Sequence, residues 1–409
     1  MERARPPTTL PSYPGAALAD FRIGVLTGGG DVPGLNSVIK SVVYKTTELG
    51  GEVVGIRRGW EGLTHVTFEG GTDERYVRPL TRTNTRAIDR SGGTALHTSR
   101  TNPQKMARRA LPEHIDAGRL DGWQIGEDRY DLTPLVLENI ERLGLTHLVA
   151  IGGDDTLSFA ARLGREGVPL IAIPKTMDND VPGTEYCIGF SSAVTRAKEL
   201  INRQRTTLGS HERIGVFRIF GRNSGYTAWY AAYVTSSRCV IPESPFDLDR
   251  LCNLLVEDRR LNPSGYSLLI ASEGAIWRGG RVAEVGEADM YGHRHKANVG
   301  ETIAEEIRRR SGVETVHSDL TYDLRSGDPD ALDTMVGITF ANVALDLIRE
   351  GVTGRMVAIR DGKYAHADLP DGRGGARTID VASLYNAERY RPIYTDKLGS
   401  PLMLGPAAV

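Results

Sequence analysis

Two glycines followed by two carboxylates and a threonine, residues 152–156, form the run with the most specific chemistry in this chain of 409 residues. Glycines let a phosphate approach the backbone closely. A carboxylate such as Asp154 or Asp155 at the end of a strand can hold Mg²⁺, a hard cation that usually takes only one or two protein ligands. Helix capping by an aspartate or a threonine is the alternative. Two adjacent carboxylates after two glycines favour a phosphate and metal site.

A second run, residues 174–180, combines one lysine, two carboxylates and one amide in the order Pro-Lys-Thr-Met-Asp-Asn-Asp. Asp178 can take a proton from a hydroxyl nucleophile, and Lys175 can neutralise a transferring phosphoryl group. A solvated turn is the alternative for such a polar run. Both runs directly follow apolar segments, so the sequence places them at the ends of strands.

Three further runs offer contacts to phosphate. Residues 28–34 are rich in glycine and lie between an apolar strand and a helix, where free backbone amides form an anion site. They contain neither a Walker lysine nor a Gly-x-Gly-x-x-Gly fingerprint. Arg213 and Arg222, the second in the run 220–225, carry planar guanidinium groups that suit phosphate oxygens. Residues 322–325 are the last run. Tight turns and surface salt bridges are the alternatives for these three.

Apolar periodicity predicts alternating strands and helices along the chain. Strands are predicted over 22–27, 52–57, 146–151, 168–174, 213–219, 267–272 and 356–359, and helices over 37–49, 156–166, 192–204, 224–234, 298–310 and 333–350. This alternation predicts an α/β fold with two doubly wound, mostly parallel-sheet lobes and the active site between them. Ligands of such sheets bind at the carboxyl ends of the strands, where the runs described above fall.

Changes of composition near residues 190 and 325 predict a second lobe, 190–324, inserted into a first lobe formed by 21–189 plus 325–360. Residues 1–20 form a flexible N-terminal extension in this division, and 361–409 a C-terminal extension. The net charge of −2 shows no basic excess, which argues against nucleic acid as a partner. We expect no membrane partner either, because no apolar run approaches the roughly 20 residues of a membrane span.

The three cysteines have no paired spacing, which argues against disulfides and a zinc site and favours a cytoplasmic location.

Taken in order, Gly-Gly-Asp-x-Thr, Pro-Lys-Thr-x-Asp-Asn-Asp and Gly-Arg-x-x-Gly resemble the phosphofructokinase family over roughly residues 22–360. NAD kinases and lipid kinases also carry a Gly-Gly-Asp-Gly run, but they lack the other two runs. The resemblance implies that 21–189 plus 325–360 bind the donor and that 190–324 bind the sugar phosphate.

The resemblance also implies roles for individual residues. Asp178 is the expected catalytic base, Arg222 and Lys175 offset charge in the transition state, and Asp154 is linked to Mg²⁺, the expected cofactor. The expected donor-binding residues are Gly30, Arg100, Asp155, Thr156 and Lys175. The expected acceptor-binding residues are Thr176, Met177, Asp178, Asp180, Arg213, Phe220, Gly221, Arg222, Glu243, Glu273, Tyr322 and Arg325. The family supplies some acceptor contacts across a subunit interface, so a homodimer or homotetramer is expected.

Asp155 bears on the choice of donor. Members that use ATP resemble Gly-Gly-Asp-Gly, in which the second glycine lets the α-phosphate of the nucleotide pass. A carboxylate at that position fills the space and repels a phosphate by like charge. Asp155 together with Lys175 is the family's pattern for inorganic pyrophosphate, so Asp155 is also counted among the catalytic residues. Phe159 stands where many ATP-using members have a glycine near the adenine, which also disfavours a nucleotide.

The resemblance thus predicts Mg²⁺-dependent, reversible transfer of a phosphoryl group from pyrophosphate to the 1-hydroxyl of fructose 6-phosphate. Phe220 replaces a family methionine that packs against the sugar, so sedoheptulose 7-phosphate or another sugar phosphate is an alternative acceptor. Tyr322 and Val316 also depart from the short ATP-using members, in a way that suits longer members. An ATP-dependent phosphofructokinase is a competing interpretation, as is a regulatory subunit without activity. The presence of Asp178, Asp154 and Arg222 opposes a regulatory subunit.

Overall fold

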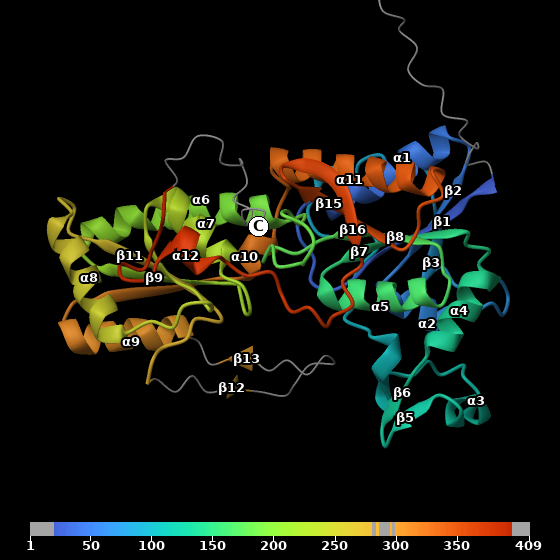
Figure 1. The fold of residues 1–409 in the computed structure, drawn as a ribbon, viewed down its shortest axis with the longest axis horizontal. Coiled ribbons are helices and arrows are strands. Elements are labelled where there is room, and N and C mark those ends of the chain that lie inside the picture. The colour runs from blue at the N-terminus through green and yellow to red at the C-terminus, as the bar shows by residue number, and fades with distance from the viewer. Residues whose placement is uncertain (1–19, 280–283, 286–294, 297–298, 395–409) are drawn as a thin grey trace, which may run out of the picture.

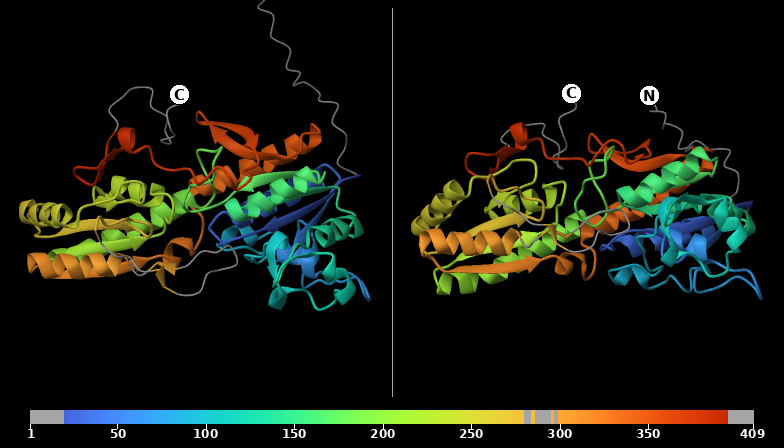
Figure 2. Two further views of the ribbon diagram at one scale, coloured as in Figure 1. Left: turned by 60° about the horizontal axis from the view of Figure 1, so that its bottom comes forward. Right: turned by 90° about the horizontal axis from the view of Figure 1, so that it is seen from below.

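The computed structural model describes residues 20–279, 284–285, 295–296 and 299–394, which build two α/β lobes (Figure 1). Nearly all of the predicted N-terminal extension, residues 1–19, lies outside the described residues, as do residues 395–409 of the C-terminal extension. The two lobes lie side by side along the longest axis of the molecule, and the views in Figure 2 show the same arrangement from other directions.

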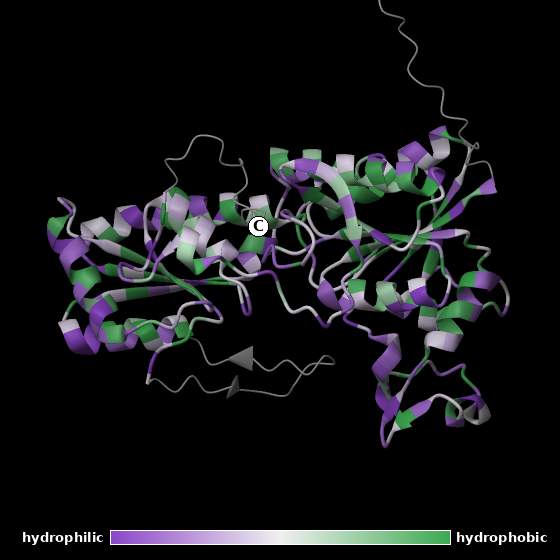
Figure 3. Ribbon diagram, in the orientation of Figure 1, coloured by the Kyte–Doolittle hydropathy of each residue, from purple (hydrophilic) through white to green (hydrophobic). Residues whose placement is uncertain are grey.

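The first lobe is built on a seven-stranded sheet with the order β16-β15-β8-β7-β1-β2-β3. Its edge strands β16 and β3 are antiparallel to their neighbours, and the strands between them are parallel. The central strands are almost continuously apolar, as expected for parallel strands covered on both faces (Figure 3). The strands are Lys363–Asp368 (β16), Arg355–Arg360 (β15), Leu170–Pro174 (β8), His147–Gly152 (β7), Arg22–Thr27 (β1), Glu52–Ile56 (β2) and Val77–Leu80 (β3).

Helices cover both faces of this sheet (Figure 1). One face carries Leu35–Glu48 (α1) and Ala331–Arg349 (α11), and the other carries Trp60–His65 (α2), Thr133–Arg142 (α4) and Asp154–Arg165 (α5). A small three-stranded sheet projects from the lobe beside α4, with its own apolar cluster. It comprises Met106–Ala107 (β4), Gln124–Gly126 (β5) and Arg129–Tyr130 (β6), and the same region holds Ala117–Asp121 (α3) and the 3-10 helices Pro103–Lys105 and Arg108–Ala110. The 3-10 helix Ile88–Arg90 instead packs against α1.

The second lobe is built on a parallel four-stranded sheet with the order β10-β11-β9-β14. Its strands are Arg238–Val240 (β10), Ser267–Ser272 (β11), Ile214–Ile219 (β9) and Thr315–Leu320 (β14). Phe190–Ser210 (α6) and Tyr226–Thr235 (α7) lie over one face, and Leu248–Leu261 (α8) and Val299–Ser311 (α9) over the other. The remaining elements are Glu284–Val285 (β12), His295–Lys296 (β13), Tyr322–Arg325 (α10), Val381–Leu384 (α12), Tyr385–Asn386 (β17) and Arg391–Pro392 (β18).

The predicted fold class, two mostly parallel α/β lobes, is therefore confirmed. The residue boundaries of the lobes stay a prediction.

The expectation that no apolar run approaches the length of a membrane span was wrong for α11, which has the length and composition of a helix that can cross a membrane. Half of the apolar stretch of α11 is buried inside the protein, where the helix packs against α1 and β8. One part of the surface of α11 therefore packs into the first lobe.

A buried carboxylate ties α11 to the segment that leads into α6. Asp333 is fully buried, and its Oδ1 accepts hydrogen bonds from Tyr186 Oη at 2.6 Å and from Gly189 N at 2.8 Å. Its Oδ2 accepts one from Ser192 N at 2.8 Å. Gly189 has a φ of 99°, and a Cβ there would lie 2.4 Å from Val32 Cβ. The first-lobe helix α11 thereby fixes the segment through which the chain enters the second lobe.

We expect Asp333→Ala to lower the free energy of unfolding by about 2–4 kcal/mol, because several buried donors lose their acceptor. Urea unfolding followed by circular dichroism measures this change. Asp346→Ala, at a half-exposed position on the same helix, should change the free energy of unfolding by less than about 0.5 kcal/mol. Equal effects of the two substitutions would contradict the structural role of Asp333.

Candidate active site

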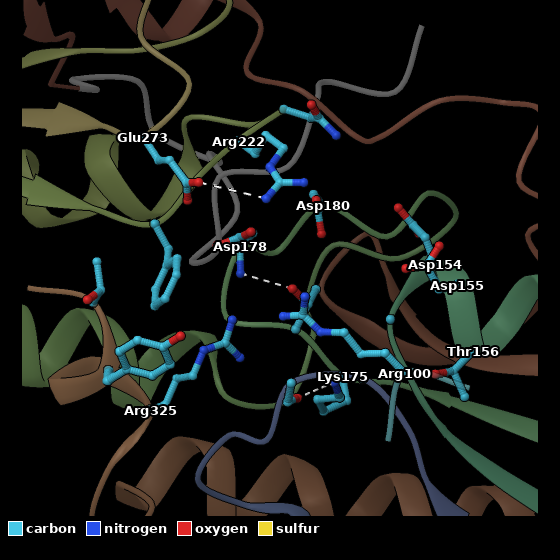
Figure 4. A pocket seen from close by; sticks show the side chains of 18 of the residues that line it. Arg100, Asp154, Asp155, Thr156, Lys175, Asp178, Asp180, Arg222, Glu273 and Arg325 are labelled. Atoms are coloured by element: carbon cyan, nitrogen blue, oxygen red, sulfur yellow. Dashed lines mark hydrogen bonds and ion pairs between the residues drawn. The ribbon is translucent and has the colours of Figure 1, made fainter. Parts of the chain in front are cut away.

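A cavity of about 390 Å³ is lined by residues from both lobes (Figure 4). Most of these residues directly follow the carboxyl ends of parallel strands: β1, β7 and β8 in the first lobe, and β9, β11 and β14 in the second. This is where ligands of doubly wound sheets bind. The cavity brings together most of the predicted site residues: Gly30, Arg100, Asp154, Asp155, Thr156, Lys175, Thr176, Asp178, Asp180, Phe220, Arg222, Glu273, Tyr322 and Arg325.

Two glycines bring the turns after β1 and β7 together. A Cβ on Gly28 would lie 2.4 Å from Thr156 Oγ1, and a Cβ on Gly152 would lie 2.3 Å from Thr156 Cβ. The side chain of Thr156, only 2% exposed, fills the space between these turns. Gly28 and Gly152 therefore serve close packing, whereas Gly29, Gly30 and Gly153 line the cavity and offer backbone to a ligand.

Asp154 and Asp155 occupy the first turn of α5 and line the cavity. Burial, reinforced by the neighbouring charges of Asp180 and Asp155, raises the pKa of Asp154 to about 7. Its buried Oδ1 has no hydrogen-bond partner among the described residues. The described part of the chain contains no group of three or more His, Cys, Asp or Glu side chains able to hold a metal. A single unpartnered carboxylate oxygen nevertheless fits Mg²⁺, which usually keeps most of its ligands from water and substrate.

Lys175 is a buried cation at the floor of the cavity. Its side chain is 3% exposed, and its Nζ donates a hydrogen bond of 2.5 Å to the carbonyl oxygen of Gly30. Burial, and next the nearby charge of Arg325, lower the pKa of Lys175 to about 7. An anion bound beside this side chain would favour the protonated lysine, because opposite charges stabilise each other most strongly away from water.

Asp178 lies in the turn that follows β8, opposite Arg222 (Figure 4). Its backbone N–H donates to Thr176 Oγ1 at 3.2 Å, and its Oδ1 is buried without a partner among the described residues. Burial and the charge of Asp180 raise the pKa of Asp178 to about 7. Burial also raises the pKa of Asp180. A carboxylate with a pKa near neutrality is suited to general base catalysis.

The second-lobe side of the cavity is aromatic and cationic. The guanidinium carbon of Arg325 lies 4.6 Å from the ring centroid of Phe220, and Tyr322 meets the same ring edge-on at 6.2 Å. Arg325 Nη1 also donates to the carbonyl oxygen of Asp31 at 3.0 Å. Arg222 Nη2 lies 3.8 Å from Glu273 Oε1. A phosphate and the hydroxyl groups of a sugar are the kind of ligand that these side chains suit.

Arg218, Asn223 and Thr321 also line the cavity, and none of them is among the residues predicted from the sequence to form the site. Arg218 lies 3.9 Å from Glu273 Oε1, and its buried Nε has no partner among the described residues. The sequence did contain a sign that Arg218 has a function, because it is the single charged residue in the otherwise apolar strand β9. A charge inside a buried strand needs a polar neighbour, and here it faces the cavity.

The structure places the other predicted residues outside the cavity. Met177 is in the core and Gly221 adopts a φ of 125° in the turn after β9. Glu243 Oε1 accepts hydrogen bonds from the backbone N–H groups of Gly225 and Ile379. Arg213 precedes β9, at the end opposite to the cavity. Since six residues of strand span about 20 Å, Arg213 does not reach the cavity of its own chain.

Residues 22–348 match the family model described as phosphofructokinase, and the chain belongs to this family. It is 36% identical to a pyrophosphate–fructose 6-phosphate 1-phosphotransferase of Streptomyces coelicolor, over 88% of this chain and 97% of that protein. It is 33% identical to ATP-dependent 6-phosphofructokinase 3 of the same organism, over 90% of this chain and 99% of that protein. These similar identities leave the choice of donor to the residues of the site.

The crystal structure of a pyrophosphate-dependent phosphofructokinase from Marinobacter aquaeolei is similar to this structure with a TM-score of 0.69. The similarity covers 91% of this chain and 88% of that chain, at 18% sequence identity. It supports the two-lobed fold described above.

Phe159, expected near the adenine side of a donor, is 1% exposed and does not line the cavity. Its ring meets Trp60 edge-on at 4.9 Å, and Trp60 Nε1 donates to the carbonyl oxygen of Thr156 at 3.2 Å. The two aromatic rings therefore support the first turn of α5 from the core.

We expect Phe159→Ala to lower the free energy of unfolding by about 3–5 kcal/mol, because it leaves a cavity in the core. The ratio of turnover with ATP to turnover with pyrophosphate should stay unchanged in protein that is still folded. Denaturant unfolding and paired donor assays measure both quantities. A gain in ATP use without loss of stability would instead show that Phe159 faces the donor.

Proposed function

We propose that this chain transfers a phosphoryl group from pyrophosphate to the 1-hydroxyl of fructose 6-phosphate, giving fructose 1,6-bisphosphate and phosphate. Membership of the family and the names of several relatives support this reaction. The observation that carries the choice of donor is the pair Asp155 and Lys175, which line the same cavity. The carboxylate opposes the additional phosphate of a nucleotide, and the lysine suits the compact charge of pyrophosphate.

The first-lobe side of the cavity is the proposed donor site. Pyrophosphate would lie against the backbone of Gly30, with Arg100 and Lys175 balancing its charge. Asp154 would hold Mg²⁺ through the carboxylate oxygen that lacks a protein partner. When bound, Mg²⁺ neutralises charge on the phosphoryl oxygens. The amides at the start of α5 add positive potential on the same side.

The second-lobe side would hold the acceptor. Arg325 and, from a second copy of the chain, Arg213 would hold the 6-phosphate, so that the active enzyme would be a homodimer or homotetramer. Asp178 would accept the proton of the 1-hydroxyl group. At the same time the oxygen of that hydroxyl group would bond to the near phosphorus of pyrophosphate. The bridging P–O bond breaks in the same step, and phosphate leaves with the electron pair. Arg222 would offset charge on the transferring group.

Phosphate is the leaving group in this scheme, so we propose that the reaction runs measurably in both directions. We also propose a cytoplasmic location. The three cysteines, Cys187, Cys239 and Cys252, are buried free thiols, which fits a reducing compartment.

Asp178→Asn should lower kcat by about 10²–10⁴-fold, because the amide cannot accept the proton of the hydroxyl. The KM values for both substrates should change little, since the side chain keeps its size. Steady-state kinetics measures both parameters, and Asp128→Asn, on the exposed turn between β5 and β6, serves as the control. Near-native kcat in Asp178→Asn would refute its role as the base.

Asp155→Gly should increase ATP-supported turnover by about tenfold or more, because removing a like-charge contact of about 1–4 kcal/mol favours the nucleotide. Asp155→Asn is the matched control, since it removes the charge and keeps the size of the side chain. Initial rates with ATP and with pyrophosphate measure the change. No gain in either variant would mean that Asp155 does not exclude ATP.

Because its pKa is lowered to about 7, Lys175 is mostly protonated below that pH and mostly neutral above it in the free enzyme. We therefore expect kcat/KM for pyrophosphate to fall as pH rises through about 7. Bound pyrophosphate raises the pKa of the lysine, so kcat should fall only at higher pH. If kcat/KM for pyrophosphate and kcat fell over the same range of alkaline pH, this role of Lys175 would be contradicted.

A further inference from the structure

The chain crosses from the first lobe to the second a second time after β16. Residues 369–380 connect β16 to α12 without forming a helix or strand, and β18 then packs against α7 and β10. Figures 1 and 2 show this segment in red, leaving the seven-stranded sheet and ending over the helices of the second lobe. On its way it contacts the loop that carries Asp178 and Asp180, through Arg377.

Arg377 donates hydrogen bonds to three carbonyl oxygens of that loop. Its backbone N–H donates to Asp180 O at 2.7 Å. Its Nη1 donates to Asn179 O and to Glu185 O, each at 3.1 Å. Asn179 Nδ2 also donates to Glu185 O at 3.0 Å. The guanidinium group thus joins the outgoing and the returning arm of the loop.

The residue between the two carboxylates has an unusual backbone conformation. Asn179 has a φ of 53°, in the left-handed region, which asparagine adopts more readily than most residues other than glycine. Its side-chain Oδ1 accepts a hydrogen bond from Cys187 N at 2.8 Å, and its carbonyl oxygen points to Arg377. These two hydrogen bonds hold both the side chain and the carbonyl group of Asn179 in place. Loss of the arginine side chain would leave two carbonyl oxygens of the loop without this donor and would let Asp178, the residue before Asn179, move.

Arg377 is itself held by α7 of the second lobe. Its guanidinium carbon lies 4.2 Å from the ring centroid of Tyr226, the first residue of α7. Tyr226 Oη donates to Thr378 O at 3.1 Å. The next residue of α7, Thr227, donates through Oγ1 to Met177 O at 2.8 Å. The loop is therefore fixed against the second lobe on both sides of Asp178.

Glu243 binds the same segment at Ile379, two residues after Arg377. Its Oε1 accepts hydrogen bonds from Ile379 N at 2.9 Å and from Gly225 N at 2.8 Å. Gly225 directly precedes α7. One carboxylate oxygen thus joins the C-terminal segment to the start of the helix that holds Arg377, which gives Glu243 a structural task outside the cavity.

On the basis of the phosphotransfer reaction proposed above, we propose that Arg377 is a positioning residue for catalysis. From the C-terminal segment it holds the backbone of the Asp178–Asp180 loop, so that Asp178 reaches the acceptor hydroxyl that the second lobe binds. Arg377 is not among the residues that line the cavity, and it acts through the loop rather than on the substrates. The C-terminal segment is then part of the catalytic apparatus.

Arg377→Ala should lower kcat by about 10- to 100-fold, because a displacement of about 1 Å at the reacting groups can cost about 10²-fold. The KM values for pyrophosphate and fructose 6-phosphate should stay within about twofold, since the groups that bind them remain. Added guanidinium chloride, at concentrations well below those that unfold the protein, should restore part of the lost kcat. Sodium chloride at the same concentration should not.

Arg391→Ala, in β18 and outside residues 369–380, is the matched control. Arg391 Nη1 donates to Ser236 O at 3.0 Å, and its Nη2 lies 2.8 Å from Asp258, away from the cavity. This variant should lose stability without loss of kcat and without a response to guanidinium. If Arg377→Ala does not fold, Arg377→Lys carries the test, because it keeps the charge and loses the planar group. It should also show a lowered kcat with unchanged KM values.

Hydrogen–deuterium exchange gives a readout that does not require activity. Amides of residues 177–187 should exchange faster in Arg377→Ala than in the wild type or in Arg391→Ala. The role of Arg377 would be overturned if Arg377→Ala kept the wild-type kcat. It would also be overturned if guanidinium did not restore the lowered kcat and the amides of residues 177–187 exchanged at the wild-type rate. A wild-type protein inactive with both pyrophosphate and ATP would instead refute the proposed function. In that case, unchanged exchange in Arg377→Ala would still overturn the positioning role.

Discussion

The burial of opposite charges beside one strand end is the constraint on which the rest of this structure depends. Lys175 and Asp178 lie three positions apart after β8, and both are withdrawn from water. Desolvation disfavours the charged form of each group, so it lowers the pKa of the lysine and raises that of the aspartate. Such burial costs free energy unless the charges find partners. A bound anion would supply a partner for Lys175, and the hydroxyl group of an acceptor would supply one for Asp178.

The two sheets supply the rigidity that this constraint demands. Central strands with apolar side chains on both faces end at one edge of each sheet, and the polar loops leave from there. Packing between Thr156 and the glycines around it sets the distance between the loops after β1 and β7. Asp333 and Arg377 then fix two segments by which the chain passes between the lobes. The site therefore depends on both crossings as well as on its own residues.

The sequence predicted the central strands and most of the long helices, because apolar runs and helical spacing are local signals. It did not predict β14, whose residues Thr315–Leu320 include a histidine, a serine and an aspartate and form one edge of the second sheet. The short motifs predicted most of the cavity, since each follows a strand end. Arg218 and Arg377 were missed for different reasons. Arg218 required knowledge of the face of β9 that points to the cavity, and Arg377 acts through backbone carbonyls distant in sequence, which no local pattern reveals.

The residues of this cavity favour pyrophosphate rather than ATP as the phosphoryl donor. Steady-state kinetics of the wild-type protein with Mg²⁺ and fructose 6-phosphate, comparing the two donors in parallel, tests it most directly. We expect kcat/KM for pyrophosphate to exceed that for ATP by about 100-fold or more, because Asp155 contributes about 2.7 kcal/mol of unfavourable interaction with the nucleotide. Equal or greater kcat/KM with ATP would contradict it.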